Sequence, residues 1–392
     1  MGPTPRVYRL TALVLLTGLA AGLVGCATQT VSSETNSPTF QDYPLDENPR
    51  IDVRWRKDVG LEGLQTYRPR EQASPTLIPR TDRYDIGVGT GSGMVYILRA
   101  GDGKERWRRS LEHGIRASPT VGSKRMYVGT AGGQIVALDR KTGETVWSVN
   151  RRFGIESKLA LTPKLVLAST NGGTLVALSR GDGSVVWTYE RSTPKEFTVQ
   201  GTGAPVVADE RIYAGFSDGT LVSLNAEDGS EIWNTDLSGG GADFTDIISP
   251  IVLDDERIFA VSYSAGVHAL DRASGQVTWT KSMDNVSSLE PAGQWLYVTQ
   301  ATGRVAALSK NRGTEQWGLK LQEDLPVEVT QAGPFLFVST GSGPLYVVSR
   351  ATGHPLTKWG PSNGFNTKTV FNERHGFILS NRGYLYSFSV AW

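Results

Sequence analysis

The hydrophobic and polar positions of the chain form a hairpin pattern that is repeated along most of its length. In the clearest copy, apolar residues fill positions 135–138, a polar turn closes on Gly143, and a second segment carries Trp147. Glycine suits the left-handed backbone at the point where a type I turn runs into a bulge. Because all of positions 135–138 are apolar, both faces of that strand must be covered. The pattern therefore predicts hairpins that stack against one another, since a lone hairpin buries too little surface.

The hairpin returns about every 40 residues. A tryptophan follows the turn glycine by four residues in six of the seven complete copies, and the last copy has Thr357 at that place, with Trp359 two residues later. A period of this length, with four short strands in each repeat, is typical of a β-propeller. The turn glycines of the complete copies are Gly103, Gly143, Gly183, Gly229, Gly275, Gly313 and Gly353.

The two ends of the repeated region each hold half of a further copy. Residues 51–57 have the pattern of the second hairpin strand, including Trp55, and residues 383–388 have the pattern of the first strand without its turn. Pairing of these ends would leave no open sheet edge. We therefore predict an all-β, eight-bladed β-propeller of four-stranded antiparallel blades, closed by pairing of the N- and C-terminal strands. Ser-Pro segments such as 118–119 should open the innermost strands, and the tryptophans should pack between blades from the outermost strands.

Two successive connections between copies are longer than the others. About 21 residues separate most tryptophans from the end of the next inner hairpin strand, but 27 residues follow Trp187 and Trp233. These insertions should emerge as neighbouring loops on one face of the ring, and long loops on a rigid scaffold often carry function. A binding role is one interpretation, and folding back onto their own blades is the other.

The two insertions differ in composition. In the first, over residues 191–201, Phe197 and Val199 alternate with polar residues, an arrangement suited to strand pairing with a partner. The second, over residues 237–247, has a run of glycines followed by Phe244 between two acidic residues.

The beginning of the chain is typical of a secretory signal. Arg6 and Arg9 precede an apolar run over residues 10–23, shorter than the roughly 20 apolar residues of a membrane span. The run leads to Leu-Val-Gly-Cys at Cys26, the sole cysteine, so the chain cannot form an internal disulfide. This ending resembles the lipobox of bacterial lipoproteins, whose cysteine is acylated after cleavage; an ordinary cleavage site beside an incidental cysteine is the alternative. Ala27, where inner-membrane lipoproteins of enterobacteria have aspartate, implies the outer membrane.

These features predict three parts of the chain: a lipoprotein signal peptide over 1–25, a lipidated flexible tether over 26–50, and the propeller over 51–392. The tether is rich in Ser, Thr, Pro and acidic residues without periodicity. With 40 Lys and Arg against 39 Asp and Glu, the chain has no broad field for nucleic acid.

The repeat copies around Gly143 and Gly275 resemble those of pyrroloquinoline-quinone (PQQ) dehydrogenases and of the BamB family. BamB proteins are lipoproteins of the machinery that assembles β-barrels in the outer membrane. The lipobox, the eight blades without an appended domain, and the two insertions at the family's partner-binding loops favour BamB. This resemblance implies a non-enzymatic scaffold, lipid-anchored in the outer membrane and facing the periplasm. It would bind the periplasmic polypeptide-transport-associated (POTRA) domains of BamA and aid barrel insertion, with unfolded barrel precursors as a further class of client.

The resemblance also implies partner-binding residues. Phe197 and Val199 match an apolar pair in the family's first loop, and Gln200 stands where enterobacterial members have arginine. Asp243 and Asp246 stand for the acidic pair of the second loop, although they align with that pair only after a shift.

The alternative is a lipid-anchored periplasmic quinoprotein of the PQQ type, or a ligand-binding propeller. Quinone dehydrogenases with this repeat stack their cofactor on a disulfide of neighbouring cysteines, which a chain with one cysteine lacks. The glycine-rich segment 87–93 precedes strand residues instead of a helix, so it is expected to be a hairpin turn and not a phosphate loop. We therefore expect no catalytic residues, no cofactor and no metal. The histidines are spread over different repeats without ligand spacing and are expected at the surface or satisfied in the interior; they are His113, His268, His354 and His375.

Overall fold

The computed structural model describes residues 49–60, 69–81, 83–191, 203–239, 246–247, 251–263, 265–322, 324–361 and 363–391. The chain divides into two units, Met1–Asn36 and Ser37–Trp392, and all described residues belong to the second. Over these ranges the backbone forms strands and turns, and it contains no helix of the length and hydropathy needed to cross a membrane.

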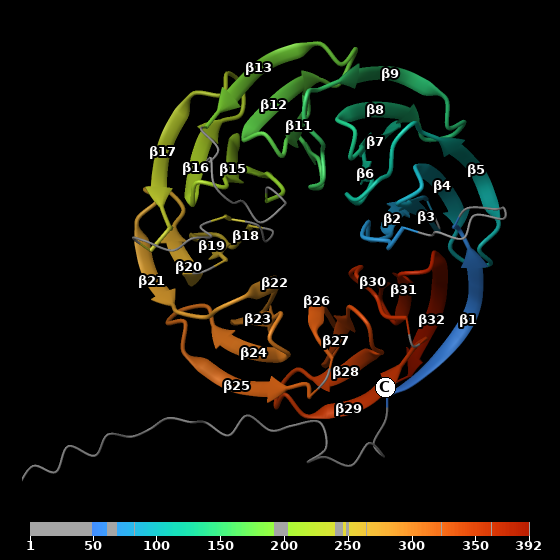
Figure 1. The fold of residues 1–392 in the computed structure, drawn as a ribbon, viewed down its shortest axis with the longest axis vertical. Helices are drawn as coiled ribbons and strands as arrows, with labels where there is room; N and C mark the ends of the chain where they lie inside the picture. The colour runs from blue at the N-terminus through green and yellow to red at the C-terminus, as the bar shows by residue number, and fades with distance from the viewer. Residues whose placement is uncertain are drawn as a thin grey trace, which may run out of the picture. The chain divides into compact units, whose positions relative to one another are not determined.

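The strands form eight four-stranded sheets, the blades, which are arranged around one axis (Figure 1). Blade 1 contains β2 (Thr76–Pro79), β3 (Tyr84–Gly89), β4 (Met94–Arg99) and β5 (Glu105–Ser110). Blade 2 contains β6 (Thr120–Val121), β7 (Arg125–Gly129), β8 (Gln134–Asp139) and β9 (Thr145–Asn150). Blade 3 contains β10 (Ala160–Leu161), β11 (Leu165–Ser169), β12 (Thr174–Ser179) and β13 (Val185–Glu190). Blade 4 contains β14 (Val206–Ala208), β15 (Arg211–Gly215), β16 (Thr220–Asn225) and β17 (Glu231–Asp236).

The second half of the ring continues in the same way. Blade 5 contains β18 (Val252–Leu253), β19 (Arg257–Ser262), β20 (Gly266–Asp271) and β21 (Val277–Lys281). Blade 6 contains β22 (Val286–Ala292), β23 (Trp295–Gln300), β24 (Arg304–Ser309) and β25 (Glu315–Lys320). Blade 7 contains β26 (Pro326–Ala332), β27 (Phe335–Thr340), β28 (Leu345–Ser349) and β29 (Pro355–Trp359). Blade 8 contains β30 (Val370–Asn372), β31 (His375–Leu379), β32 (Tyr384–Ala391) and β1 (Arg50–Asp58).

In each of blades 1 to 7 the first strand lies nearest the axis and the fourth lies at the rim (Figure 1). The short strands that follow the Ser-Pro segments are therefore innermost, and the tryptophan strands are outermost, as the repeat predicts. The third strand of blade 2, β8, is buried over Ile135–Leu138, so both of its faces are covered.

Blade 8 closes the ring with strands from both ends of the chain. Its order is β30, β31, β32, β1, and β1 pairs antiparallel with β32 from Arg50–Ala391 to Asp58–Tyr384, with one bulge between Val53 and Trp55. The predicted eight-bladed, end-to-end closed propeller is confirmed. Closure leaves the rim strand β1 as the point at which the chain enters the ring.

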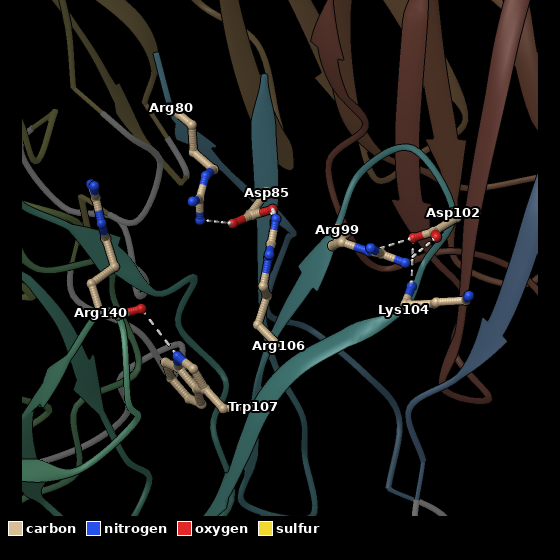
Figure 2. A network of polar contacts seen from close by, with 8 residues as sticks. All are labelled: Arg80, Asp85, Arg99, Asp102, Lys104, Arg106, Trp107 and Arg140. Atoms are coloured by element: carbon tan, nitrogen blue, oxygen red, sulfur yellow. Dashed lines mark hydrogen bonds and ion pairs between the residues drawn. The ribbon is translucent and has the colours of Figure 1, made fainter. Parts of the chain in front are cut away.

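The outer tryptophans hold neighbouring blades together. Trp107 is 8% exposed, and a Cβ atom on Gly143 of the next blade would lie 2.7 Å from its ring. Its indole N–H donates to the carbonyl of Arg140 at 3.0 Å (Figure 2). The turn glycine, with φ of +77°, thus serves both the turn and the close approach of the indole. The same bond is made by Trp55 to Ala100, Trp147 to Arg180, Trp279 to Lys310 and Trp317 to Arg350.

Blade 7 departs from this arrangement where the sequence does. Thr357 takes the register position of the tryptophan, opposite Val347. Trp359 instead packs against Phe365 in the connection to blade 8 and against Tyr386 and Phe388 on β32, with ring centroids 5.2 to 6.2 Å away. The late tryptophan therefore still joins two blades, but through an aromatic cluster.

Candidate functional site

The first insertion begins at a fixed point of the ring. Arg191 follows β13 directly, and its Nε lies 2.6 Å from Oδ2 of Asp218 in the turn between β15 and β16. Its Nη2 donates to Oγ1 of Thr220 at 3.1 Å. Blade 3 is thereby tied to blade 4 at the base of the insertion.

A second contact joins the same two blades nearby. The hydroxyl of Tyr189 on β13 donates to the Glu231 carboxylate on β17. This hydrogen bond lowers the pKa of Glu231, whereas burial raises the pKa of Tyr189. Both shifts keep the carboxylate charged and the phenol protonated at neutral pH, the pair of states that this bond requires.

Hydrogen bonds locate the second insertion. Ile247 is fully buried, and its N–H donates to the carbonyl of Phe216 at 3.2 Å. Ile115 makes the same kind of bond to Thr90. Ile247 comes 14 residues after its tryptophan, whereas Ile115 comes eight residues after Trp107. The six additional residues therefore lie between β17 and Asp246, within the segment that the spacing of the repeats indicates.

The two insertions return to the ring side by side. The N–H of Gly203, the first described residue after the first insertion, donates to the carbonyl of Ile247 at 3.1 Å. Ile247 itself ends the second insertion. The prediction that the insertions are neighbours is therefore confirmed at their bases.

Asp246 has a structural position. It is 1% exposed, and its carbonyl accepts a hydrogen bond from the N–H of Tyr263 at 3.1 Å. Gly114 and Gly154 accept the equivalent bond in other blades. Its carboxylate thus lies within the fold, and direct contact of this side chain with a partner stays a prediction that burial disfavours. The other predicted contact residues and the predicted lipidation site lie outside the described residues. They are Phe197, Val199, Gln200, Asp243 and Cys26.

A cavity of about 430 Å³ lies beside the start of the second insertion, lined by Leu237, Ser238 and His268 among others. His268 is 5% exposed; its Nδ1 lies 3.1 Å from Oγ1 of Thr280, and its Nε2 is buried without a hydrogen-bond partner. Burial lowers the pKa of His268 to about 4, so the ring is neutral at pH 7. Of its two ring nitrogens, only Nδ1 has a hydrogen-bond partner among the described residues, so His268 is an interior histidine that these residues satisfy in part. The signal was in the repeat, since Val136, Val176 and Val222 occupy this strand position in blades 2 to 4.

Charged residues lie on the innermost strands of blades 6 and 7 and just before that of blade 8. Nζ of Lys368 lies 2.7 Å from Oε2 of Glu290, and Ser288 donates to Glu328 at 2.8 Å. Burial raises the pKa of Glu328, although the nearby Lys368 ammonium and the hydrogen bond from Ser288 oppose this shift. In the described part of the ring, histidine, cysteine and acidic side chains form no group of three or more that could hold a metal ion.

Comparison with known proteins assigns the repeat. A family model described as outer membrane protein assembly factor BamB matches residues 91–319 and 301–391. The crystal structure of BamB from Moraxella catarrhalis is 18% identical, with a TM-score of 0.75, over 87% of this chain and 100% of that one. The comparison with curated proteins finds no matching sequence.

Two further structures share the propeller fold. The computationally designed Ika8 protein is 15% identical, with a TM-score of 0.67, over 82% of this chain and 97% of that one. Quinohemoprotein alcohol dehydrogenase from Comamonas testosteroni is 13% identical, with a TM-score of 0.70, over 86% of this chain and 76% of that one. At such identities the structural likeness concerns the fold, which scaffold proteins and enzymes share. The family model, by contrast, spans most of the repeated region, and the chain therefore belongs to the family of outer membrane protein assembly factor BamB.

Proposed function

We propose that this protein is a lipid-anchored, non-enzymatic scaffold of the β-barrel assembly machinery, located on the periplasmic side of the outer membrane. It binds the POTRA domains of BamA and aids the assembly and insertion of barrel proteins. The match of the BamB family model to residues 91–391 carries this proposal. The chain is divided into a signal peptide over 1–25, a tether over 26–50 acylated at Cys26, and the propeller over 51–392.

The geometry at the bases of the insertions supports a binding role. The Arg191–Asp218 ion pair fixes the point at which the first insertion leaves the ring, and the Gly203–Ile247 hydrogen bond joins the points at which both insertions return to it. Fixed ends reduce the conformational entropy that a loop loses when it binds. The predicted contact residues would then meet BamA from insertions whose bases are already in place. These residues are the apolar Phe197 and Val199 and the polar Gln200 and Asp243.

Capture of BamA from solubilised membranes tests the contact. A double Phe197→Glu, Val199→Glu variant should recover at least roughly tenfold less BamA, since charges would replace two apolar contacts. A matched control is Val185→Glu, Val186→Glu, because these residues are 48% and 50% exposed on β13, outside the insertion. Equal recovery with both variants would remove the first insertion from the interface. Asp243→Asn should weaken capture by a few-fold at most, since ion pairs at the rim of an interface contribute about 1 kcal/mol or less.

A quinoprotein function is the second candidate, favoured by the fold shared with quinohemoprotein alcohol dehydrogenase. The purified protein, supplied with PQQ and calcium, should then show quinone absorbance and calcium-dependent dye reduction. Under the scaffold proposal both signals stay at the level of a buffer control. A stoichiometric quinone spectrum would favour the enzyme instead.

A further inference from the structure

The rim strands of blades 8 and 1 concentrate positive charge. Strand β1 has four basic and two acidic residues, and β5 has three arginines and one glutamate, in a chain of 40 basic and 39 acidic residues. The side chains alternate along each strand but reach solvent at the circumference, because outer strands have no further strand beyond them. We call these residues the basic rim: Arg54, Arg56, Lys57, Arg106, Arg108 and Arg109.

The opposite side of the ring has the opposite charge. Strand β13 has one acidic residue and β17 has two, and neither strand has a basic residue. The other rim strands carry at most one residue of each sign. Figure 1 shows β1 and β5 next to each other on one side of the ring, and β13 and β17 on the far side. The outer strands of the ring are therefore charged asymmetrically across its diameter.

Part of the basic rim is held in place by a buried carboxylate. Asp85 is 4% exposed at its side chain and accepts from Arg80 at 3.0 Å and from Arg106 at 3.3 Å (Figure 2). Two guanidinium groups share this one carboxylate, so the group keeps a net positive charge. Arg80 and Arg106 nevertheless stay 49% and 37% exposed. Ordered, solvent-facing cations lose little entropy when they meet an anionic surface.

We propose that the basic rim lies against the anionic phospholipid surface of the membrane and thereby orients the ring. Strand β1 is where the chain enters the propeller, and Arg50 comes 24 residues after Cys26, the residue proposed to carry the lipid. A tether of this length allows many orientations, so the anchor alone does not select one. Anionic lipid favours each nearby Lys or Arg by about fivefold, which makes the rim strands β1 and β5 the preferred side. Of these features, only the lipid anchor at Cys26 rests on the proposed function.

This orientation places the described bases of the two insertions away from the lipid. The bases follow β13 and β17, on the side of the ring opposite β1 and β5 (Figure 1). The acidic rim there is repelled by anionic headgroups. The insertion side is then open to a periplasmic protein while the basic rim rests on the membrane.

Site-specific quenching tests the orientation without BamA. The full-length mature protein is reconstituted in vesicles of phosphatidylethanolamine and phosphatidylglycerol that contain a headgroup nitroxide quencher. A fluorophore is attached through Ser110→Cys at the end of β5 or through Thr188→Cys on β13, both exposed positions. The label at position 110 should be quenched roughly fivefold more than the label at position 188, and the difference should shrink from about 0.1 M to about 1 M salt as the Debye length falls.

Charge variants separate the basic rim from general attraction. Lys57→Gln, Arg108→Gln, Arg109→Gln together remove three of the six charges of the basic rim and should at least roughly halve the difference between the two labels. The matched control, on blades 3, 5 and 6, should retain it: Lys164→Gln, Lys281→Gln, Lys310→Gln.

Three results would overturn the proposal: equal quenching at both positions, the same difference in purely zwitterionic vesicles, or loss of the difference in the control variant. Any of these would assign the basic rim to an acidic protein partner or to solvent. The mass of the purified protein reports acylation of Cys26, and BamA capture reports the insertions. Failure of the proposed function is therefore seen separately.

Discussion

The turn between β4 and β5 offers a sharp test of how the ring is closed. It contains two glycines in different environments. Gly103 has a φ of +67°, and a Cβ atom there would lie 2.8 Å from Cε3 of Trp55 on the N-terminal strand β1. Gly101 is exposed, and a Cβ atom there would have no neighbour within 4 Å. The two positions therefore compare the same substitution with and without contact to the closing strand.

Gly103→Ala should destabilise the propeller, and Gly101→Ala should not. The left-handed backbone costs a residue with a Cβ atom about 1–2 kcal/mol, and displacement of the Trp55 ring adds about 1–3 kcal/mol. The free energy of unfolding should therefore fall by roughly 2–5 kcal/mol in Gly103→Ala. Gly101→Ala should leave it unchanged or raise it by about 0.4–1 kcal/mol, because alanine restricts the unfolded chain.

Equilibrium urea unfolding followed by tryptophan fluorescence measures both values. An unchanged dependence on urea concentration would show that the surface exposed on unfolding is the same in all three proteins. If Gly103→Ala and Gly101→Ala had the same midpoint, the packing of Trp55 on this turn, and with it this account of closure, would be refuted.

Three further changes test buried groups. Burial raises the pKa of Glu71 to about 7, so between about pH 4.5 and pH 7 the folded state holds a proton that the unfolded state releases. The free energy of unfolding should therefore fall by about 3 kcal/mol as the pH rises through this range. Urea unfolding of Glu71→Gln at several pH values should lack this slope. At pH 7 the free energy of unfolding of His268→Val should equal that of the wild type or exceed it by about 1 kcal/mol, because the change removes a buried nitrogen without a partner among the described residues. A large loss of stability would mean that Nε2 is satisfied. The low pKa of His268 should also cost the wild type stability as pH falls from about 6.5 towards 4, whereas the valine variant should be spared. Phe388→Ala should lower the free energy of unfolding by about 3–5 kcal/mol in thermal or urea unfolding, since this fully buried ring packs against Phe337 and Trp359; a loss below 1 kcal/mol would contradict that packing.

Much of the architecture could be predicted from local sequence because each blade repeats the same hairpin, which a short stretch of residues specifies. A turn glycine with positive φ, a buried strand before it and a tryptophan after it specify a hairpin that must stack on its neighbour. The half copies at 51–57 and 383–388 specify closure, since an open edge would be left otherwise. The spacing after Trp187 and Trp233 likewise located both insertions.

The candidate site was less predictable, because burial depends on neighbours from other blades. Asp246 reads as an exposed loop acid, yet it occupies the place that Gly114 takes in the ordinary connection, and it is buried there. His268 reads as an incidental histidine, yet its strand position faces the preceding blade. Neither environment is encoded within a few residues of the side chain itself.

The sequence by itself determined the repeat, the number of blades and the lengths of their connections, because these follow from short-range patterns of apolar residues and glycine. Only the tertiary structure decided which side chains share a surface. Strands β1 and β5 belong to different copies of the repeat, and their arginines form one basic rim because closure of the ring makes the first strand of the chain the outer strand of the last blade. The electrostatic potential at a surface sums over charges that are close in space, whatever their separation along the chain. The asymmetry of the rim therefore appears only once the ring is closed.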